Sequence, residues 1–332
     1  MSHLSFDSIF DHFNNLNVLI IGDVMVDAYI WGNVERMSPE APVPVVSVEK
    51  KDFRLGGAAN VALNIKAMGA NPILCSIIGD DRDGNNFISR LKNRNIEALG
   101  VFKSSDRPTT VKTRVISDDK HIVRIDEEST DCINDIEKEA IIQNIEKLLP
   151  KCQVVIFEDY NKGTITPEVI DFTVKLANEH GIPTVVDPKK ANFLDFKGVT
   201  LFKPNLKELK EGLGLAIDFD IKNQSELKVA VKNLIALLSC GGAFVTLSEH
   251  GVYIDHCDEQ HHIPAHQRQI TDVSGAGDTV ISIAALCVAI GLSPYLIAAL
   301  SNLGGGLVCE HVGVVTIDKQ QLLKEAQGKM EL

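Results

Sequence analysis

The second half of the chain alternates short apolar runs with longer amphipathic segments, and this alternation begins at about Ile133. The runs of strand length are 154–157, 184–187, 199–203 and 243–247. The segments with helical spacing are 136–148, 167–179, 206–212, 226–238, 278–290 and 294–308. Strands that recur with a helix between them pair in parallel, and helices then cover both faces of the sheet. The sequence therefore predicts an α/β fold with a mostly parallel central sheet.

The first half of the chain contains further strands and helices of this α/β fold, and also two stretches of a different kind. Strands are expected at 17–21 and 72–78, and helices at 58–68 and 83–94. Two other stretches, 29–55 and 110–126, are rich in β-forming residues, and the first contains three prolines that suit edge strands and turns. We expect these two stretches to form a small β-sheet lid inserted in a single domain that spans 1–332.

The charge balance limits the partners that such a chain can have. The 332 residues include 33 Lys and Arg against 45 Asp and Glu, a net charge of −12, which argues against nucleic acid or an anionic membrane as a partner. No Lys or Arg precedes Arg36, which argues against a secretory signal peptide, and the longest apolar stretch, 279–292, is short for a membrane span. Seven scattered cysteines without a C-x-x-C pair indicate reduced thiols, so we expect a cytoplasmic protein.

The stretch from Thr271 to Thr279 carries the clearest chemical signal. Gly275 and Gly277 free the backbone to turn its N–H groups inward, and the helix that follows presents its positive end. Such a turn can hold an anion, for example a phosphoryl group in transfer. Asp278 lies in the first helical turn, where the helix dipole is expected to keep it ionised and hence a weak base. An ordinary strand-to-helix turn with an acidic cap explains these glycines equally well.

Other nucleotide-binding patterns are missing from the sequence. It contains no G-x-x-x-x-G-K-[ST] motif, which excludes a P-loop NTPase. No G-x-G-x-x-G follows the first expected strand, which argues against a dinucleotide oxidoreductase.

Five segments in order resemble the motifs of the ribokinase-like (PfkB) carbohydrate kinases. They are Gly22–Asp27, Gly56–Asn60, Gly79–Gly84, Pro204–Glu208 and Val273–Thr279. The resemblance extends from about Asn17 to Thr316 and implies a ribokinase-like three-layer sandwich with a β lid. It also implies an ATP-dependent kinase that uses Mg²⁺, with K⁺ as a further cation, and a homodimer formed through the lid.

The resemblance assigns roles to individual positions. Asp278 would be the catalytic base, with an anion hole formed by Gly275, Ala276 and Gly277. The sugar would be held by Asp27, Gly56, Gly57 and Asn60. Glu208 would contact Mg²⁺ through water, because Mg²⁺ keeps several waters. The ATP-binding positions would be Asn205, Leu206, Lys207, Glu208, Ser248, Gly251 and Asn302.

Further segments resemble one group within that family, the D-glycero-β-D-manno-heptose-7-phosphate kinases. These segments are Arg36–Val46, Thr110–Val115, Glu158–Gly163 and Val186–Lys189. The implied reaction is phosphorylation of O1 to give the 1,7-bisphosphate, on the route to ADP-heptose for lipopolysaccharide core or related glycans. Residues that depart from the pattern are Val26, Ala28, Glu158 and Lys203, of which Ala28 and Glu158 would affect the sugar pocket.

A site that binds a sugar phosphate needs positively charged side chains, and only a few of the segments expected near the cleft contain them. The candidates for holding the substrate or ATP phosphates are Lys112, Arg114, Arg124, Lys162 and Lys189. Two alternatives stay open: a kinase of the same family for another sugar or sugar phosphate, and a catalytically silent sugar- or nucleotide-binding regulatory protein. No segment resembles a nucleotidyltransferase domain, so we expect another polypeptide to adenylylate the product.

Overall fold

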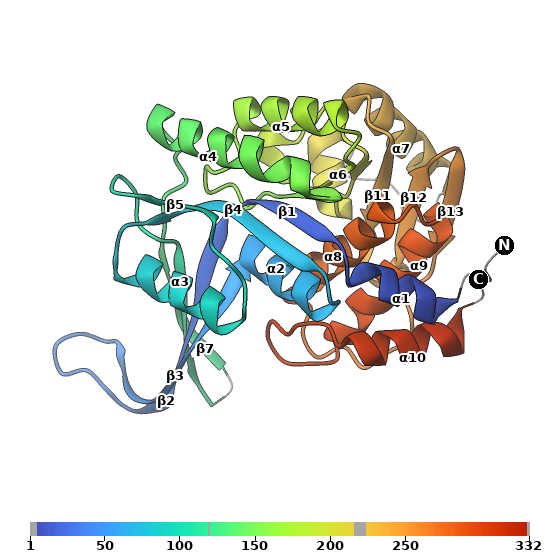
Figure 1. Ribbon diagram of the computed structural model, residues 1–332. Coiled ribbons are helices and arrows are strands. Elements are labelled where there is room, and N and C mark those ends of the chain that lie inside the picture. The colour runs from blue at the N-terminus through green and yellow to red at the C-terminus, as the bar shows by residue number, and fades with distance from the viewer. Residues whose placement is uncertain (1–4, 119, 216–223, 331–332) are drawn as a thin grey trace.

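A nine-stranded sheet forms the centre of the molecule in the computed structural model, which describes residues 5–118, 120–215 and 224–330 (Figure 1). The strand order is β13-β12-β11-β10-β9-β8-β1-β4-β5, parallel from β5 to β11 and antiparallel at β12 and β13. The strands are β1 (Asn17–Gly22), β4 (Asn71–Gly79), β5 (Gly100–Ser104), β8 (Val154–Glu158), β9 (Thr184–Asp187), β10 (Leu201–Phe202), β11 (Gly242–Thr246), β12 (Val252–His256) and β13 (Glu259–Ile263).

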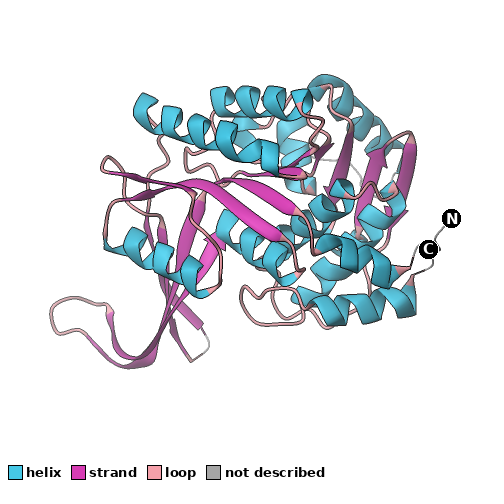
Figure 2. Ribbon diagram, in the orientation of Figure 1, coloured by secondary structure: helices cyan, strands magenta, loops and turns pink. Residues whose placement is uncertain are grey.

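Helices cover both faces of this sheet, so that the strands lie between two helical layers (Figures 1 and 2). One layer contains α4 (Asp135–Leu148), α5 (Pro167–Glu179), α6 (Leu206–Leu213) and α7 (Gln224–Leu238). The other contains α1 (Phe6–Phe13), α2 (Ala58–Ala67), α3 (Arg82–Asn93), α8 (Ala276–Ala289), α9 (Pro294–Val308) and α10 (Lys319–Lys329).

The alternation of side chains along β1 explains why two separate apolar cores exist. Val18 and Ile20 pack into the core with α2, α8 and α9, whereas Leu19 and Ile21 pack into the core with α4, α5 and α7. Successive side chains of a strand point to opposite faces, so a strand that is apolar at every position is buried on both sides. The predicted α/β fold with a mostly parallel sheet is confirmed.

A second sheet of four strands, in the order β3-β2-β6-β7, projects from this body (Figure 1). Its strands are β2 (Val24–Met37), β3 (Pro44–Gly57), β6 (Val111–Ser117) and β7 (Lys120–Glu127). The two β-rich stretches of the sequence supply most of these strands, and the proline-rich stretch 38–43 forms the turn between β2 and β3. We call this sheet the lid.

The two faces of the lid differ sharply in chemistry. Strand register places one row of charged residues across the sheet: Arg54, Asp27, Lys112 and Asp126. The neighbouring row, on the opposite face, consists of Phe53, Ala28, Thr113 and Ile125. Ala28 therefore faces away from Asp27, so the expectation that it affects the sugar pocket is wrong.

Some elements were not expected from the sequence. They are α1, β5, the hairpin of β12 and β13, and α10. The helix expected from Asp278 begins two residues earlier, at Ala276, because Gly275 caps it. Among the residues described, no helix is long and apolar enough to cross a membrane.

Candidate active site

Several charged residues gather where the parallel strands end. Asp23 follows β1, Glu158 and Asp187 end β8 and β9, and Lys203 follows β10. In parallel α/β sheets the carboxyl ends of the strands share one edge, and ligands bind in the crevice outside it. The N-terminus of α8 points to the same edge, since Asp278 interacts electrostatically with Asp187 and Lys203.

Asp278 is a buried carboxylate held by two donors. The Asn60 Nδ2 group donates to one carboxylate oxygen at 2.6 Å, and the Tyr160 hydroxyl donates to the other at 2.8 Å. Burial raises the pKa of Asp278 to about 6, although both hydrogen bonds oppose that rise. Desolvation outweighs the helix dipole, so Asp278 is a stronger base than the sequence predicts, while a pKa of about 6 still leaves the carboxylate mostly ionised at neutral pH. A carboxylate with a pKa near 6 is better suited to accept a proton at neutral pH.

The first turn of α8 offers its backbone to an anion only in part. Gly275 caps the helix with φ of +77°, a conformation that favours glycine. The Ala276 N–H already donates to the Val273 carbonyl at 3.2 Å, so Ala276 is not a free donor. The N–H groups of Gly277 and Asp278 lie in the first turn and have no intrahelical acceptor. At Gly277 a Cβ would meet only Asp187, at 3.6 Å, which leaves room for a ligand atom.

A pocket of about 190 Å³ separates the lid from this helix. It brings together predicted residues from distant parts of the chain with others that were not predicted. The lining residues are Met25, Asp27, Gly56, Gly57, Lys112, Arg114, Tyr160, Ser274, Gly275, Asp278 and Val314. The expected base, three of the four expected sugar ligands and two of the five expected cations thus share one cavity, whereas Asn60 does not line it.

Asp27 and the glycine pair form the lid side of the pocket. The Arg114 guanidinium donates to Asp27 at 2.6 Å. A methyl group on Gly56 would collide with the Asp27 carboxylate, and Gly57 has φ of +60° beside the Asp23 carbonyl. The two glycines are therefore required by the protein's own packing, whether or not a sugar is also present. Asn60, expected to contact a sugar hydroxyl, donates from its amide nitrogen to Asp278, and its contact with a sugar stays a prediction.

The expected cations are not free, since each has an acidic partner. Lys112 contacts Asp126 at 3.1 Å and Glu128 at 2.7 Å. Lys162 contacts the other oxygen of Glu128 at 2.7 Å. Arg124 contacts Asp126 at 3.0 Å. These five side chains form a charged cluster at the junction of lid and body. Lys112, a member of the cluster, also lines the pocket.

Lys189 belongs to a different cluster beneath the pocket. Its ammonium group contacts Glu208 at 2.7 Å and lies 5.5 Å from the centre of the Tyr160 ring. Lys203, buried nearby, contacts Asp187 at 2.7 Å. The five expected cations therefore divide between the lid junction and this inner cluster.

Glu158 is a carboxyl group buried in the inner cluster. Burial, and then the charges of Asp187 and Asp278, raise its pKa well above the usual range. One of its oxygens has no hydrogen-bond partner in the described structure. Glu158 does not line the pocket, so its effect on the sugar would be indirect.

The contacts of Glu208 at the start of α6 indicate how it could take part in Mg²⁺ binding. Asn205 and Glu208 form a capping box, in which each side chain bonds the backbone N–H of the other. Glu208 is buried, with one oxygen bound by Lys189 and the other by the Asn205 N–H. Within the described ranges no three acidic, His or Cys side chains converge on a metal position. The donors present therefore fit Mg²⁺ contact through water and do not fit direct coordination.

The remaining residues expected at ATP lie farther along this edge. Asn205 pairs with Thr246 at the end of β11, just before the turn that contains Ser248. Gly251 has φ of +85°, and any side chain there would strike the Ile263 carbonyl. The Asn302 amide donates to the Pro264 carbonyl at 2.9 Å. None of these residues lines the 190 Å³ pocket, nor do Leu206 and Lys207.

Sequence reasoning assigned no role to three residues that organise the site. Tyr160 bonds the base, and Glu128 bridges Lys112 and Lys162. Asp23 accepts three backbone N–H bonds, from Tyr160, Lys162 and Thr164, at 2.9–3.0 Å. Tyr160 and Asp23 lie inside segments that resemble the kinase motifs, and this resemblance is the signal that could have identified them. Glu128 lies outside every such segment.

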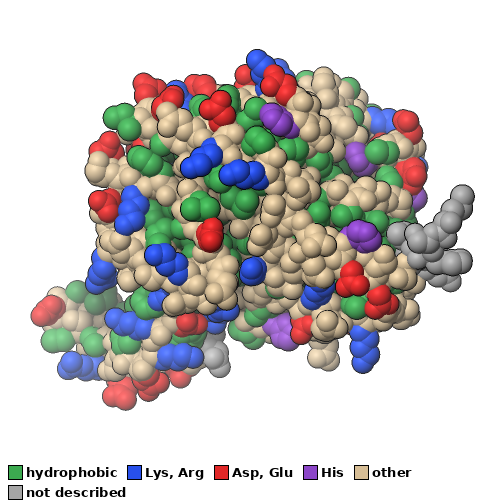
Figure 3. All heavy atoms as spheres, viewed as in Figure 1, with side chains coloured by type: hydrophobic (Ala, Val, Ile, Leu, Met, Phe, Trp, Pro, Cys, Tyr) green, Lys and Arg blue, Asp and Glu red, His purple; other side chains and the backbone are tan. Residues whose placement is uncertain are grey.

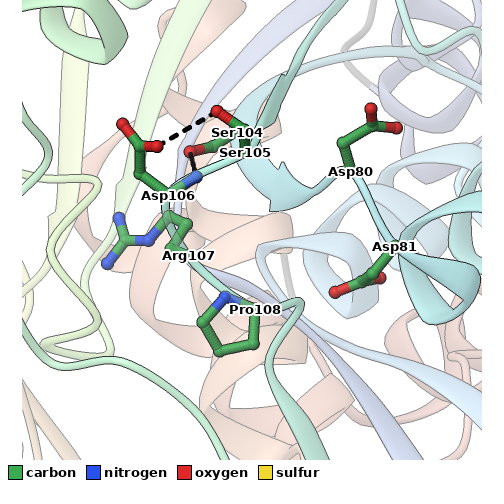
Figure 4. A pocket seen from close by; sticks show the side chains of 7 residues that line it. All are labelled: Asp80, Asp81, Ser104, Ser105, Asp106, Arg107 and Pro108. Atoms are coloured by element: carbon green, nitrogen blue, oxygen red, sulfur yellow. Dashed lines mark hydrogen bonds between the residues drawn. The ribbon is translucent and has the colours of Figure 1, made fainter.

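A larger hollow of about 410 Å³ lies beyond the ends of β4 and β5 (Figure 4). Its lining residues are Asp80, Asp81, Ser104, Ser105, Asp106, Arg107 and Pro108. Asp81 caps α3 and accepts from the N–H and hydroxyl of Thr109, so its carboxylate is used within the protein. No predicted site residue lines this hollow.

Comparison with known proteins identifies the family. Residues 15–320 match the profile described as pfkB family carbohydrate kinase. The chain is 36% identical over 324 residues to the bifunctional protein HldE of Geobacter metallireducens, covering 97% of this chain and 65% of that protein. It is also 36% identical to the HldE of Citrifermentans bemidjiense, over 98% of this chain and 66% of that protein. The chain thus spans about two thirds of the length of these relatives.

Solved structures share the fold at low sequence identity. A Y23D mutant of Escherichia coli phosphofructokinase-2 superimposes with a TM-score of 0.77 at 15% identity, over 94% of this chain and 99% of that one. Arabidopsis thaliana ribokinase, complexed with ribose and ATP, gives a TM-score of 0.71 at 17% identity, over 93% and 99%. From the profile, the relatives and the shared fold together, the chain belongs to the pfkB family of carbohydrate kinases and is a phosphotransferase with an alcohol group as acceptor.

Proposed function

We propose that this kinase uses ATP to phosphorylate O1 of D-glycero-β-D-manno-heptose 7-phosphate, giving the 1,7-bisphosphate. The observation that carries the proposal is the pocket that Asp278 of α8 lines together with Lys112 and Arg114 of the lid. A proton acceptor and cations in one cavity suit a substrate that has both a hydroxyl group and a phosphate. The 36% identity to HldE proteins favours a heptose over another sugar.

Catalysis at this site would depend mainly on how the attacking hydroxyl and the phosphoryl group are positioned. Asp278 would accept the proton of the attacking hydroxyl at the carboxylate oxygens held by Asn60 and Tyr160. Phosphoryl transfer has a loose transition state, so the base chiefly orients the nucleophile. The N–H groups of Gly277 and Asp278 would bind the oxygens of the transferred group, where negative charge is concentrated.

The lid side would hold the sugar. Asp27 suits paired hydroxyl groups, and the Arg114 bond fixes the orientation of its carboxylate. Lys112 and Lys162, at the lid junction, would bind the 7-phosphate. In the inner cluster, Lys189 and Glu208 would lie toward ATP, with Glu208 contacting Mg²⁺ through water. When bound, Mg²⁺ neutralises charge on the ATP phosphates.

Two further parts of the proposal concern the molecule as a whole. We place the reaction in the cytoplasm, in a pathway to ADP-heptose for lipopolysaccharide core or related glycans. We also propose a homodimer formed through the apolar face of the lid. Three large apolar side chains on that sheet are well exposed: Phe53 at 37%, Val123 at 48% and Ile125 at 49%.

The test is a coupled ADP-release assay over a panel of sugars and sugar phosphates. The panel contains the heptose 7-phosphate, unphosphorylated heptose, ribose, fructose 6-phosphate and tagatose 6-phosphate. We expect kcat/KM to be highest for the heptose 7-phosphate, with loss of most activity when the phosphate is absent. Preference for a hexose phosphate would replace the heptose assignment, and binding without turnover on any sugar would refute the kinase assignment itself.

A further inference from the structure

Glu128 is bound by two ammonium groups that come from different parts of the fold. It lies in the segment that leads from β7 of the lid to α4 of the body. Lys112 of β6 contacts one carboxylate oxygen at 2.7 Å, and Lys162 of the loop after β8 contacts the other at 2.7 Å. All three side chains are mostly shielded from solvent. Partial burial opposes ionisation of Glu128, yet the two lysines hold its pKa below the usual range.

This arrangement has the form of a phosphate site filled by the protein itself. Two oxygens of one anion each accept a short, charge-assisted hydrogen bond, as two oxygens of a phosphate would. Lys112 also lines the sugar pocket, so the position of Glu128 adjoins that pocket. A phosphate that bridges the two lysines as Glu128 does would take the place of the Glu128 carboxylate.

We propose that Glu128 occupies the site of the substrate's phosphate until a sugar phosphate displaces it, and that this competition makes the pocket selective for phosphorylated sugars. The inference rests on the proposed function in taking the substrate to be a sugar phosphate. A phosphate carries up to two negative charges and three terminal oxygens, so it satisfies both lysines better than one carboxylate. A neutral sugar has no group that can replace the carboxylate, and the site then stays filled.

Glu128 also reduces the unfavourable energy that the two lysines would have without an anion between them. Two ammonium groups close together and partly buried repel each other and resist desolvation. Glu128 stabilises them in the free protein, and the connection that carries it is a chain segment outside the named helices and strands. Such a segment can move a side chain without disturbing a sheet or a helix.

The test measures binding of inorganic phosphate by calorimetry, without nucleotide or sugar, so it does not depend on turnover. We compare the wild-type protein with Glu128→Gln and with Glu127→Gln, the adjacent exposed carboxylate, which makes no ion pair with any residue that the structure describes. Both substitutions remove one negative charge, and only the first removes the competitor. Lys162→Gln locates the site, because phosphate held at the lid junction must bind more weakly to it.

We expect Glu128→Gln to bind phosphate about three- to tenfold more tightly than the wild-type protein, with Glu127→Gln unchanged. Unchanged or weaker binding by Glu128→Gln, or no phosphate binding by either protein, would overturn the inference. Equal tightening by Glu127→Gln would also overturn it, since bulk charge would then be the cause. Absence of heptose phosphorylation together with tighter phosphate binding by Glu128→Gln would reject the proposed substrate and leave this inference standing.

Discussion

At the scale of single residues, the environment of Asp278 decides how this site can act. The carboxylate accepts hydrogen bonds from residues 218 and 118 positions away along the chain. No local pattern near residue 278 could reveal those partners. The motif predicts a base in a helix N-terminus, and the structure adds the burial that raises its pKa to about 6.

Replacing Asp278 by Asn removes the proton acceptor and keeps the shape of the side chain. An amide can still accept from Asn60, and the Tyr160 hydroxyl can reverse its role and accept from the new NH₂ group. We therefore expect a folded variant that binds nucleotide and sugar phosphate within a few fold of wild type. Turnover should fall by at least ~10², measured as kcat in the ADP-release assay. Near-normal kcat would remove Asp278 from the mechanism.

Tyr160 should set the pH range of the enzyme through its bond to Asp278. The base works ionised, so activity is present above its pKa and is lost as the pH falls through about 6. The Tyr160 hydroxyl favours the ionised form, and Tyr160→Phe removes that donor. We expect the acid limb of the kcat/KM profile to move up by about 0.5–1 pH unit.

The control for that experiment is Tyr295→Phe, which changes a half-exposed tyrosine on α9 that packs against His261. It should leave the pH profile in place. An acid limb that stays fixed or moves down in Tyr160→Phe would show that this hydroxyl does not tune the base.

At the scale of elements, Asp23 fixes the loop after β8. Its buried carboxylate accepts N–H groups from residues 160, 162 and 164, so one side chain orders the loop that carries Tyr160 and Lys162. In Asp23→Asn one of the two oxygens becomes an NH₂ group, which leaves at least one buried N–H without an acceptor. We expect a loss of about 1–3 kcal/mol in the free energy of unfolding and a raised KM for the sugar phosphate.

Chemical denaturation and steady-state kinetics measure both effects. Asp171→Asn is the matched control, because Asp171 is exposed on α5 and makes no ion pair with any residue that the structure describes. It should change stability by less than about 0.5 kcal/mol. Equal stability of Asp23→Asn and the control would mean that the loop holds itself without Asp23.

Most elements could be predicted because local signals and burial agree. Helix α5 spans Pro167–Glu179 in both the prediction and the structure, with Thr166 as its cap and Pro at its start. Helix α1 was missed although Ser5 caps it and Phe6, Ile9, Phe10 and Phe13 form one apolar face. Eight residues are short for a confident periodicity, and this helix depends on packing against α10.

The site could be predicted less completely than the fold. Motif residues such as Asp27 and Asp278 do reach one pocket. The pairings among charged groups could not be foreseen, because they depend on strand register. Arg114 meets Asp27 across 87 residues only because β6 lies parallel to β2 in that register. A shift by one residue would turn Arg114 to the apolar face of the lid.

At the scale of the whole molecule, the net charge of −12 is compatible with phosphorylated ligands because the cations are placed locally. Acidic and basic side chains are interspersed over the visible face, without a broad area of one sign (Figure 3). Lys112, Arg114 and Arg124 share the charged face of the lid with their acidic partners. The lid therefore faces its pocket with charges, while its apolar face is buried against the body at Val26 and Leu55 and exposed farther out at Val123 and Ile125.

The exposed part of that apolar face leads to the prediction for assembly. Phe53 and Ile125 lie in one row across the lid, and Val123 lies in the next row on the same face. A charge at the centre of such an apolar interface would have to be buried without a partner, which is strongly unfavourable. If two lids pair through these faces, Ile125→Asp should convert a dimer into a monomer, as measured by sedimentation velocity or light scattering.

Ile136→Asp is the control, since Ile136 is 75% exposed on α4 of the body and should leave the dimer intact. A wild-type monomer would contradict the proposed dimer. A dimer that survives Ile125→Asp would show that the subunits do not pair through the apolar face of the lid.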